Sequence, residues 1–140
     1  MTVEENLGEM VNGAGGRKLH KLVYEYFPIL AERRRHAAGT MSGGQQQHLA
    51  IGRASIGNPN FLLLDEPSER TQPNIVDEIS RIMIRIDRDL GTTILFVEQN
   101  LDMIMAMTQR CYVMDKSRVT AGLASYELTD RDVVKRHLQI

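Results

Sequence analysis

A short apolar run that ends in two carboxylates places the strongest constraint on the fold of this chain. Residues 61–64 are Phe, Leu, Leu and Leu, and Asp65, Glu66 and Pro67 follow directly. A strand that is apolar at every position is typical of a parallel sheet covered on both faces. We therefore predict a strand over residues 61–64 that is buried on both faces and carries Asp65 and Glu66 at its carboxyl end.

The segment after this run predicts a βαβ unit. Apolar residues recur at helical spacing from Ile75 to Leu90, charged residues lie between them, and Gly91 is a suitable helix stop. A second, mainly apolar run from Thr93 to Val97 predicts another strand. Strand, helix and strand in this order give a parallel pair with a right-handed crossover. Ligands of open α/β sheets bind at the carboxyl ends of such strands.

The rest of the chain predicts an α/β protein whose first part is helical. Glycine-rich residues predict loops at 13–16 and at 39–44. Periodicity, together with helix start and stop signals, predicts the remaining elements. They are helices over 17–30 (interrupted near Pro28), over 45–56, after Asn100, and over 130–138 with Thr129 as N-cap, and strands over 111–114 and 118–121.

Composition and charge exclude several classes of protein. Of the 140 residues, 42% are hydrophobic and 25% are charged, so the chain is not wholly disordered. The net charge of −1 gives no general attraction for nucleic acid, and for the basic run at residues 33–36 we favour solvated surface over a nucleic-acid contact. The single cysteine, Cys111, fits a reducing compartment, and no spanning segment or signal peptide is recognisable, so we expect a cytosolic location.

The paired carboxylates point to metal-assisted hydrolysis. One carboxylate at the end of a buried strand can hold a Mg²⁺ ion, directly or through water. Its neighbour can orient and deprotonate an attacking water. The alternative interpretation is that Asp65 and Glu66 only end a strand with solvated charges, and the pair alone does not decide between the two.

A second candidate site opens the helix predicted over residues 45–56. It comprises Ser42, Gly43, Gly44 and Gln45, and the two consecutive glycines let a ligand approach the backbone. Free N–H groups and the positive end of the helix dipole suit a phosphate there. The alternative is an ordinary capped helix after a glycine turn, which is favoured when the tetrapeptide is considered alone.

Taken together, these motifs resemble the ATP-binding cassette (ABC) ATPases. Residues 41–45 (MSGGQ) match the signature motif of that family, with Met41 in place of the usual Leu, and residues 61–66 match its Walker B strand and the following glutamate. Residues 92–100 (TTILFVEQN) resemble the ATPase subunits of importers for branched-chain amino acids and for urea, which carry Gln where most cassettes carry a switch histidine.

The resemblance implies a partial P-loop NTPase (ABC ATPase) fold and a role for each motif. It implies a helical signature subdomain over residues 1–56 and the C-terminal part of a RecA-like catalytic core over residues 57–140. The implied site roles are Mg²⁺ binding by Asp65, general-base catalysis by Glu66, contact with the γ-phosphate by Gln99, binding of the opposite subunit's ATP by Ser42, Gly43, Gly44 and Gln45, and a D-loop contact across the dimer by Ser68.

The same resemblance implies partners and a location. The chain would pair with a second ATPase subunit and dock on transmembrane permease subunits, on the cytoplasmic side of the plasma membrane. There it would use ATP and Mg²⁺ to drive uptake of branched-chain amino acids or of urea and amides.

Two alternatives remain open. One is a non-catalytic remnant or interaction module that presents the signature motif in trans, and the other is a soluble ABC ATPase acting on nucleic acid or ribosomes.

The sequence departs from the family at the phosphate-binding loop. No Gly-x-x-x-x-Gly-Lys-Ser/Thr (Walker A) occurs, so we expect the C-terminal part of a cassette that binds little ATP alone. By the family's topology the missing Walker A strand pairs with residues 94–97 and 111–114. We therefore predict open strand edges, marginal stability and aggregation. Arg70 stands where relatives usually have Gly, and we expect it to disturb the D-loop.

Overall fold

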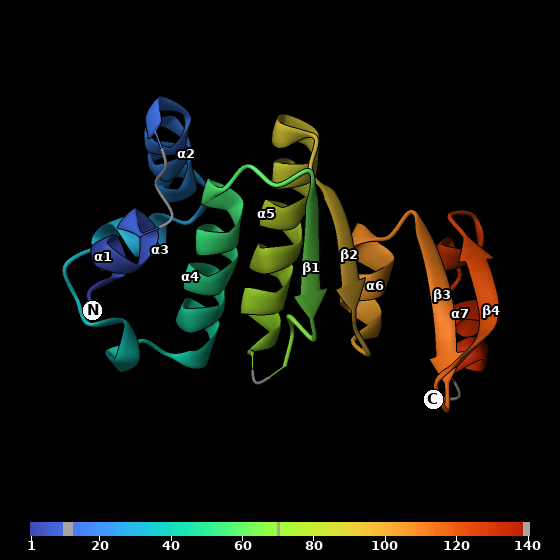
Figure 1. Cartoon of the computed structure of the whole chain (residues 1–140). Coiled ribbons are helices and arrows are strands. Elements are labelled where there is room, and N and C mark those ends of the chain that lie inside the picture. The colour runs from blue at the N-terminus through green and yellow to red at the C-terminus, as the bar shows by residue number, and fades with distance from the viewer. Residues whose placement is uncertain (10–12, 70, 139–140) are drawn as a thin grey trace. The chain divides into compact units, whose positions relative to one another are not determined.

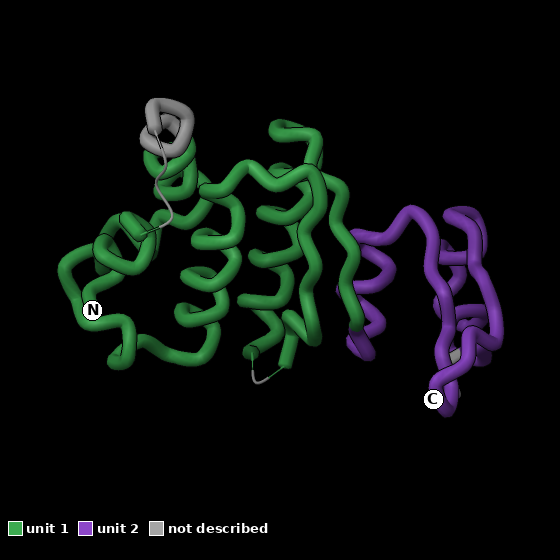
Figure 2. The backbone as a smooth tube through the Cα atoms, in the orientation of Figure 1, with its two compact units in different colours: residues 1–97 green, residues 98–140 purple. Residues whose placement is uncertain are grey.

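The computed structural model describes residues 1–9, 13–69 and 71–138, so Arg70 and its predicted effect lie outside the described residues. The chain divides into two compact units, Met1–Val97 and Glu98–Ile140 (Figure 2). The domain boundary that the resemblance implies, between residues 56 and 57, falls inside the first unit. That boundary stays a prediction.

The first unit combines helices with a two-stranded parallel sheet (Figure 1). Its elements are α1 (Val3–Gly8), α2 (Gly13–Tyr26), α3 (Pro28–Glu32), the 3₁₀ helix η1 (Ala38–Thr40), α4 (Gly43–Ile56), β1 (Phe61–Asp65), α5 (Pro73–Leu90) and β2 (Thr93–Val97). The predicted helix break near Pro28 is confirmed, because this proline opens α3, where its missing N–H has no cost.

The other helices at the start of the chain pack around α4. Helices α1, α2 and α3 each contact α4, and their side chains Leu7, Val23 and Leu30 are at most 2% exposed. They meet α4 at Gly52, where an added Cβ would lie 2.9 Å from Val23 Cγ1 and 3.2 Å from Leu30 Cδ1. The missing side chain at Gly52 thus allows this close approach.

Helix α2 begins earlier than the sequence predicts. The predicted loop at residues 13–16 is wrong, since the helix runs from Gly13. Glycine weakens a helix by about 1 kcal/mol relative to alanine, but most helix stability in proteins comes from tertiary packing. Val23 and Tyr26, each 2% exposed, fix this helix to the core. We attribute the extra turn to that packing.

Strands β1 and β2 pair in parallel with Leu63 opposite Leu95, which confirms the predicted βαβ arrangement. Helix α5 connects them and contributes Ile79 and Met83, both fully buried, to the core. It ends at Gly91, whose φ of 66° gives the left-handed cap that the sequence indicates.

Burial of this sheet is one-sided, so the prediction of burial on both faces is wrong. Leu62 and Leu64 are 6% and 8% exposed, whereas Phe61 and Leu63 on the opposite face are 54% and 63% exposed. The same alternation leaves Leu95 of β2 50% exposed. The reason is that α5 packs on one face, while no element of the described part of the first unit covers the other.

The second unit is built on an antiparallel hairpin. Its elements are α6 (Leu101–Met107), β3 (Arg110–Asp115), β4 (Arg118–Ala124), the 3₁₀ helix η2 (Glu127–Thr129) and α7 (Arg131–Leu138). Lys116 and Ser117, with φ of 46° and 64°, form the turn between the strands. Among the described residues, β2 pairs with β1 alone and β3 with β4 alone, in agreement with the predicted open strand edges.

The cap of α7 differs from the prediction by one residue. Asp130 Oδ1 accepts hydrogen bonds from the N–H groups of Asp132 (2.9 Å) and Val133 (3.3 Å). The hydroxyl of Thr129, the predicted cap, instead donates to the Tyr126 carbonyl at 2.7 Å. A carboxylate in this place also compensates the positive end of the helix dipole, which favours Asp over Thr.

Candidate functional site

The candidate residues of the first unit gather at one end of that unit. Figure 1 shows β1 and β2 ending on the lower side of the first unit, where α4 and α5 begin. Asp65 ends β1, Glu66 follows it, and Ser42 precedes α4. This is the carboxyl edge of the parallel strands, where ligands of α/β proteins bind.

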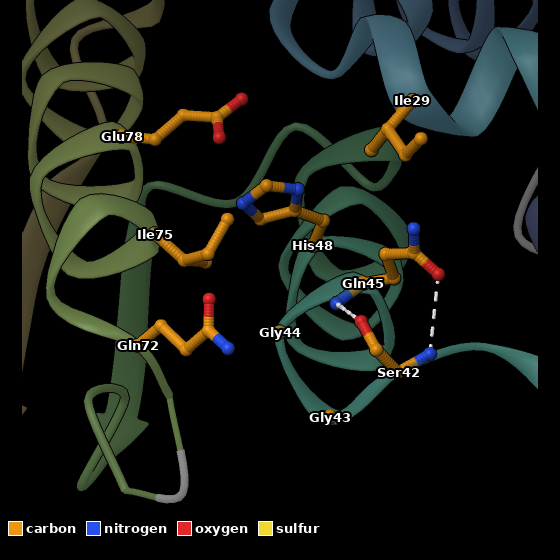
Figure 3. A pocket seen from close by; sticks show the side chains of 9 residues that line it. All are labelled: Ile29, Ser42, Gly43, Gly44, Gln45, His48, Gln72, Ile75 and Glu78. Carbon is orange, nitrogen blue, oxygen red and sulfur yellow. Dashed lines mark hydrogen bonds between the residues drawn. The ribbon is translucent and has the colours of Figure 1, made fainter.

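The residues that open α4 form a capping box. Ser42 Oγ accepts a hydrogen bond from the Gln45 N–H at 3.4 Å, and Gln45 Oε1 accepts one from the Ser42 N–H at 3.1 Å (Figure 3). Gly43 and Gly44, the first two helical residues, have N–H groups for which the helix offers no acceptor. The same four residues thus form an ordinary helix cap and also offer two free N–H groups that suit an anion.

Glu66 has an unusual backbone conformation. Its φ is 44°, in the left-handed region that residues other than glycine rarely adopt. Its N–H donates to the Val97 carbonyl at 2.9 Å, which ties the end of β1 to the end of β2. Asp65 is exposed and Glu66 is half-buried. Backbone strain of this kind often occurs at functional sites, and the catalytic role of the pair stays a prediction.

Ser68, the predicted D-loop residue, lies in the turn between β1 and α5. The Ser68 carbonyl accepts a hydrogen bond from the Thr71 N–H at 3.1 Å. The Glu66 carbonyl accepts another from the Glu69 N–H at 2.9 Å. The predicted D-loop is thus hydrogen-bonded to the backbone of Glu66, one of the two candidate carboxylates.

Gln99 belongs to the second unit, and its surroundings are defined within that unit. Its side chain is exposed, and its N–H donates to Glu98 Oε1 at 2.7 Å. The same carboxylate oxygen accepts a bond from the Asn100 N–H at 2.8 Å. Asn100 Oδ1 then caps α6 by accepting from the Met103 N–H at 3.0 Å. The contact of Gln99 with a γ-phosphate stays a prediction.

A cavity of about 420 Å³ lies beside the start of α4 (Figure 3). Residues of α3 and α4, the start of α5, and the residues directly before α4 and α5 line the cavity: Ile29, Ser42, Gly43, Gly44, Gln45, His48, Gln72, Ile75 and Glu78. Helices α4 and α5 approach closely next to it, because an added Cβ at Gly44 would lie 3.0 Å from Ile75 Cγ2. The volume falls within the range of small-molecule sites in proteins.

His48 lines this cavity, although it belongs to none of the sequence motifs described above. His48 as a whole is 2% exposed, and neither nitrogen of its ring has a hydrogen-bond partner. The imidazole packs on the Phe27 ring at 5.3 Å between centroids. Burial lowers the pKa of His48 below its usual value, and the charge of Glu78 opposes that shift. A usable signal is the spacing, since His48 lies three residues after Gln45 and therefore on the same helix face.

Residues 1–9, 13–69 and 71–138 contain no group of three or more His, Cys, Asp or Glu side chains arranged to hold a metal ion. None of the described helices has the length and apolar character needed to cross a membrane. Binding of Mg²⁺ by Asp65 stays a prediction.

Comparison with known proteins identifies one family. Residues 1–69 match the family model described as ABC transporter. The chain is 43% identical over 122 residues to the high-affinity branched-chain amino acid transport ATP-binding protein BraG of Pseudomonas aeruginosa, covering 85% of this chain and 52% of BraG. It is 30% identical over 135 residues to a probable branched-chain amino acid transport ATP-binding protein, LivF, of Archaeoglobus fulgidus, covering 94% of this chain and 57% of LivF.

Solved structures share the fold. A nucleotide-free ATP-binding cassette from an ABC transporter superposes with a TM-score of 0.75 and 25% identity, covering 100% of this chain and 63% of that chain. The ADP conformation of MJ1267, an ATP-binding cassette of an ABC transporter, gives a TM-score of 0.73 at 25% identity and the same coverage. The predicted partial α/β fold is therefore confirmed. The chain spans about half the length of the curated relatives it matches.

Proposed function

Since this chain belongs to the ABC transporter family, we propose that it acts in the ATP-binding and ATP-hydrolysing subunit of an importer for branched-chain amino acids. The observation that carries the proposal is the 43% identity with BraG over 122 residues. That stretch is most of the chain, so the likeness is not confined to one motif. The position of the candidate residues at the carboxyl edge of β1 and β2 supports the same function.

In this proposal the two carboxylates after β1 have separate tasks. Glu66 orients the attacking water and accepts its proton. Asp65 would hold Mg²⁺, which when bound stabilises negative charge on the phosphates. The exposed position of Asp65 and the left-handed backbone of Glu66 are compatible with this division, because the turn at Glu66 breaks the alternation of the strand. Gln99 would contact the γ-phosphate.

The start of α4 would bind the phosphate of a nucleotide held by a second subunit. The N–H groups of Gly43 and Gly44, with the side chains of Ser42 and Gln45, would supply the hydrogen bonds. Ser68 would contact that subunit through the D-loop. The fold is also similar to the dimeric structure of MJ0796, a bacterial ABC transporter cassette (TM-score 0.69, 24% identity, 88% of this chain and 54% of that chain). We propose a dimer that docks on membrane permeases at the cytoplasmic face.

A second candidate function is that the chain presents its signature motif to an intact cassette without using its own carboxylates. The geometry of the α4 start favours it, since the capping box that presents these N–H donors lies within Ser42–Gln45 and is formed without either carboxylate.

A mixing experiment tests both candidates. BraG with its own signature serine replaced is combined with this chain, and ATP hydrolysis is measured. We expect the chain to restore hydrolysis, Ser42→Ala to fail, and Ser117→Ala, which changes an exposed hydroxyl in the β3–β4 turn, to behave like the unmodified chain. No restored hydrolysis, or equal restoration by Ser42→Ala, would contradict both candidates.

One further variant separates the two candidates. BraG that keeps its signature but carries Gln in place of the glutamate aligned with Glu66 is combined with this chain, so that any hydrolysis uses the carboxylates of this chain. Hydrolysis that Glu66→Gln abolishes supports catalysis by this chain, and absence of hydrolysis supports presentation of the signature alone. Uptake of radiolabelled leucine and urea by cells that carry the signature variant of BraG tests the substrate. We expect this chain to restore leucine uptake, and restoration of urea uptake alone would overturn the amino acid assignment.

A further inference from the structure

The cavity at the start of α4 contains a buried polar group without a partner. His48 is 2% exposed and both of its ring nitrogens lack hydrogen bonds. Buried polar atoms in proteins are nearly always hydrogen-bonded, and an exception calls for an explanation. Figure 3 shows the imidazole between α4 and α5, in the space that Glu78 and Ile75 face from α5. The imidazole is thus aimed into a space large enough for a ligand.

Three kinds of chemistry meet in this cavity. The Glu78 carboxylate is the charged side chain among its lining residues, and neutral His48 can add a hydrogen-bond acceptor beside it. The N–H groups of Gly43 and Gly44 and the dipole of α4, a helix of 14 residues, favour a carboxylate at the other end. Ile29 and Ile75 provide apolar wall. An acidic end, an anion-binding end and an apolar wall together match a small zwitterion with an aliphatic side chain.

We propose that this cavity binds one free aliphatic α-amino acid as its zwitterion. Its ammonium group is held by Glu78 and His48, its carboxylate by the N–H groups of Gly43 and Gly44, and its side chain lies on Ile29 and Ile75. The ligand satisfies the orphaned imidazole, and the charge-assisted bonds at both ends give it affinity. The physiological role rests on the proposed function, because the carboxylate occupies the donors that a nucleotide phosphate would use. The imported amino acid thereby slows ATP hydrolysis.

Equilibrium dialysis of the whole chain with radiolabelled L-leucine, without nucleotide or BraG, tests the site directly. We expect saturable binding of one leucine per chain. Glu78→Gln removes one charge-assisted bond and should weaken binding about tenfold or more, while Asp77→Asn, which changes the exposed neighbouring carboxylate, should not. His48→Phe should weaken binding without lowering thermal stability. His36→Phe, at an exposed histidine, is its control.

Leucine analogues keep the test independent of whether the variants fold. Isoamylamine lacks the carboxylate and 4-methylpentanoate lacks the ammonium group, so each should bind about tenfold or more weakly than leucine. Equal binding of either analogue, absence of leucine binding, or equal binding by Glu78→Gln would overturn the proposal. Failure here leaves the mixing experiment with BraG unaffected. Failure of that experiment leaves leucine binding intact, so the two outcomes are distinguishable.

Discussion

Replacing Gly52 with alanine tests whether close packing at this glycine holds the helical part of the first unit together. The added Cβ would lie 2.9 Å from Val23 Cγ1, 3.2 Å from Leu30 Cδ1 and 3.7 Å from Leu7 Cδ2. Carbon atoms in favourable contact are about 3.5–4.0 Å apart, so the first two distances are too short. All three neighbours are buried, and the methyl group can therefore enter only if side chains of α2 and α3 move.

Two effects of opposite sign set the magnitude. Alanine favours the helix by about 1 kcal/mol over glycine, whereas an overpacked core costs about 1–3 kcal/mol. We expect Gly52→Ala to lower the free energy of unfolding by about 1 kcal/mol. Gly57→Ala is the matched control, because Gly57 caps the same helix at φ −66° and its added Cβ meets nothing nearer than 3.8 Å. This control should raise stability by about 0.5 kcal/mol.

Urea unfolding followed by far-ultraviolet circular dichroism measures both variants. The effect of alanine on the unfolded chain is shared, so the expected difference of about 1.5 kcal/mol between the variants comes mainly from packing at Gly52. A Gly52→Ala protein at least as stable as Gly57→Ala would refute the reasoning. That result would mean that α2 and α3 leave room for a methyl group on α4.

Three further changes have defined expected results. Gly91→Ala forces a side chain into a backbone with φ of 66° without touching any neighbour, and urea unfolding should show a loss of about 1 kcal/mol. Folding lowers the pKa of His48 from 6.5, so as the pH falls the unfolded chain is protonated at this histidine before the folded chain. Stability should therefore fall as pH drops through about 6.5 and level off below the folded pKa. Thermal melts at pH 5–8 should show a flatter profile for His48→Phe. Leu63→Lys replaces a side chain that is 63% exposed on the open sheet face. Light scattering should show less aggregation than for the unmodified chain, at an unchanged melting temperature. Equal scattering would mean that another surface causes the aggregation.

The βαβ unit could be predicted from the sequence because local signals and topology agree there. The apolar stripe of α5 is long enough to be read without ambiguity, and Gly91 marks its end. Two apolar strands that are joined by a single helix usually pair in parallel within one sheet. The predicted strand positions are accordingly confirmed, with β1 extended by one residue to Asp65.

One-sided burial could not be predicted from the same runs. A continuous apolar strand specifies that both of its faces are apolar, but it carries no information on which element covers each face. Leu62 faces the buried side, and Leu63, one residue later, is 63% exposed. The pattern of a strand covered on both faces and the pattern of this strand are identical in sequence. Only the placement of α5 distinguishes them.

The candidate site was predictable in part, for a comparable reason. Ser42 and Gln45 are recognisable as a capping box from their spacing alone. The left-handed conformation of Glu66 has no sequence signal, since glutamate is not a residue that favours positive φ. The cavity depends on the approach of α5 to α4 at Gly44 and Ile75, which are 31 positions apart in the sequence and meet only in three dimensions.

The start of α4 shows why four residues alone do not separate a helix cap from a phosphate site. Capping occupies the Ser42 hydroxyl and the Gln45 side chain, while recognition would use the N–H groups of Gly43 and Gly44, so both functions fit the same turn. His48 bears on the cap and on the amino acid proposed above, and not on the phosphate. A helix that needed only a cap would be more stable with an apolar residue in that buried place, because an unsatisfied polar atom costs about 1–3 kcal/mol. A buried imidazole without a protein partner, beside the donors of this turn, is better explained by a ligand that satisfies it than by packing.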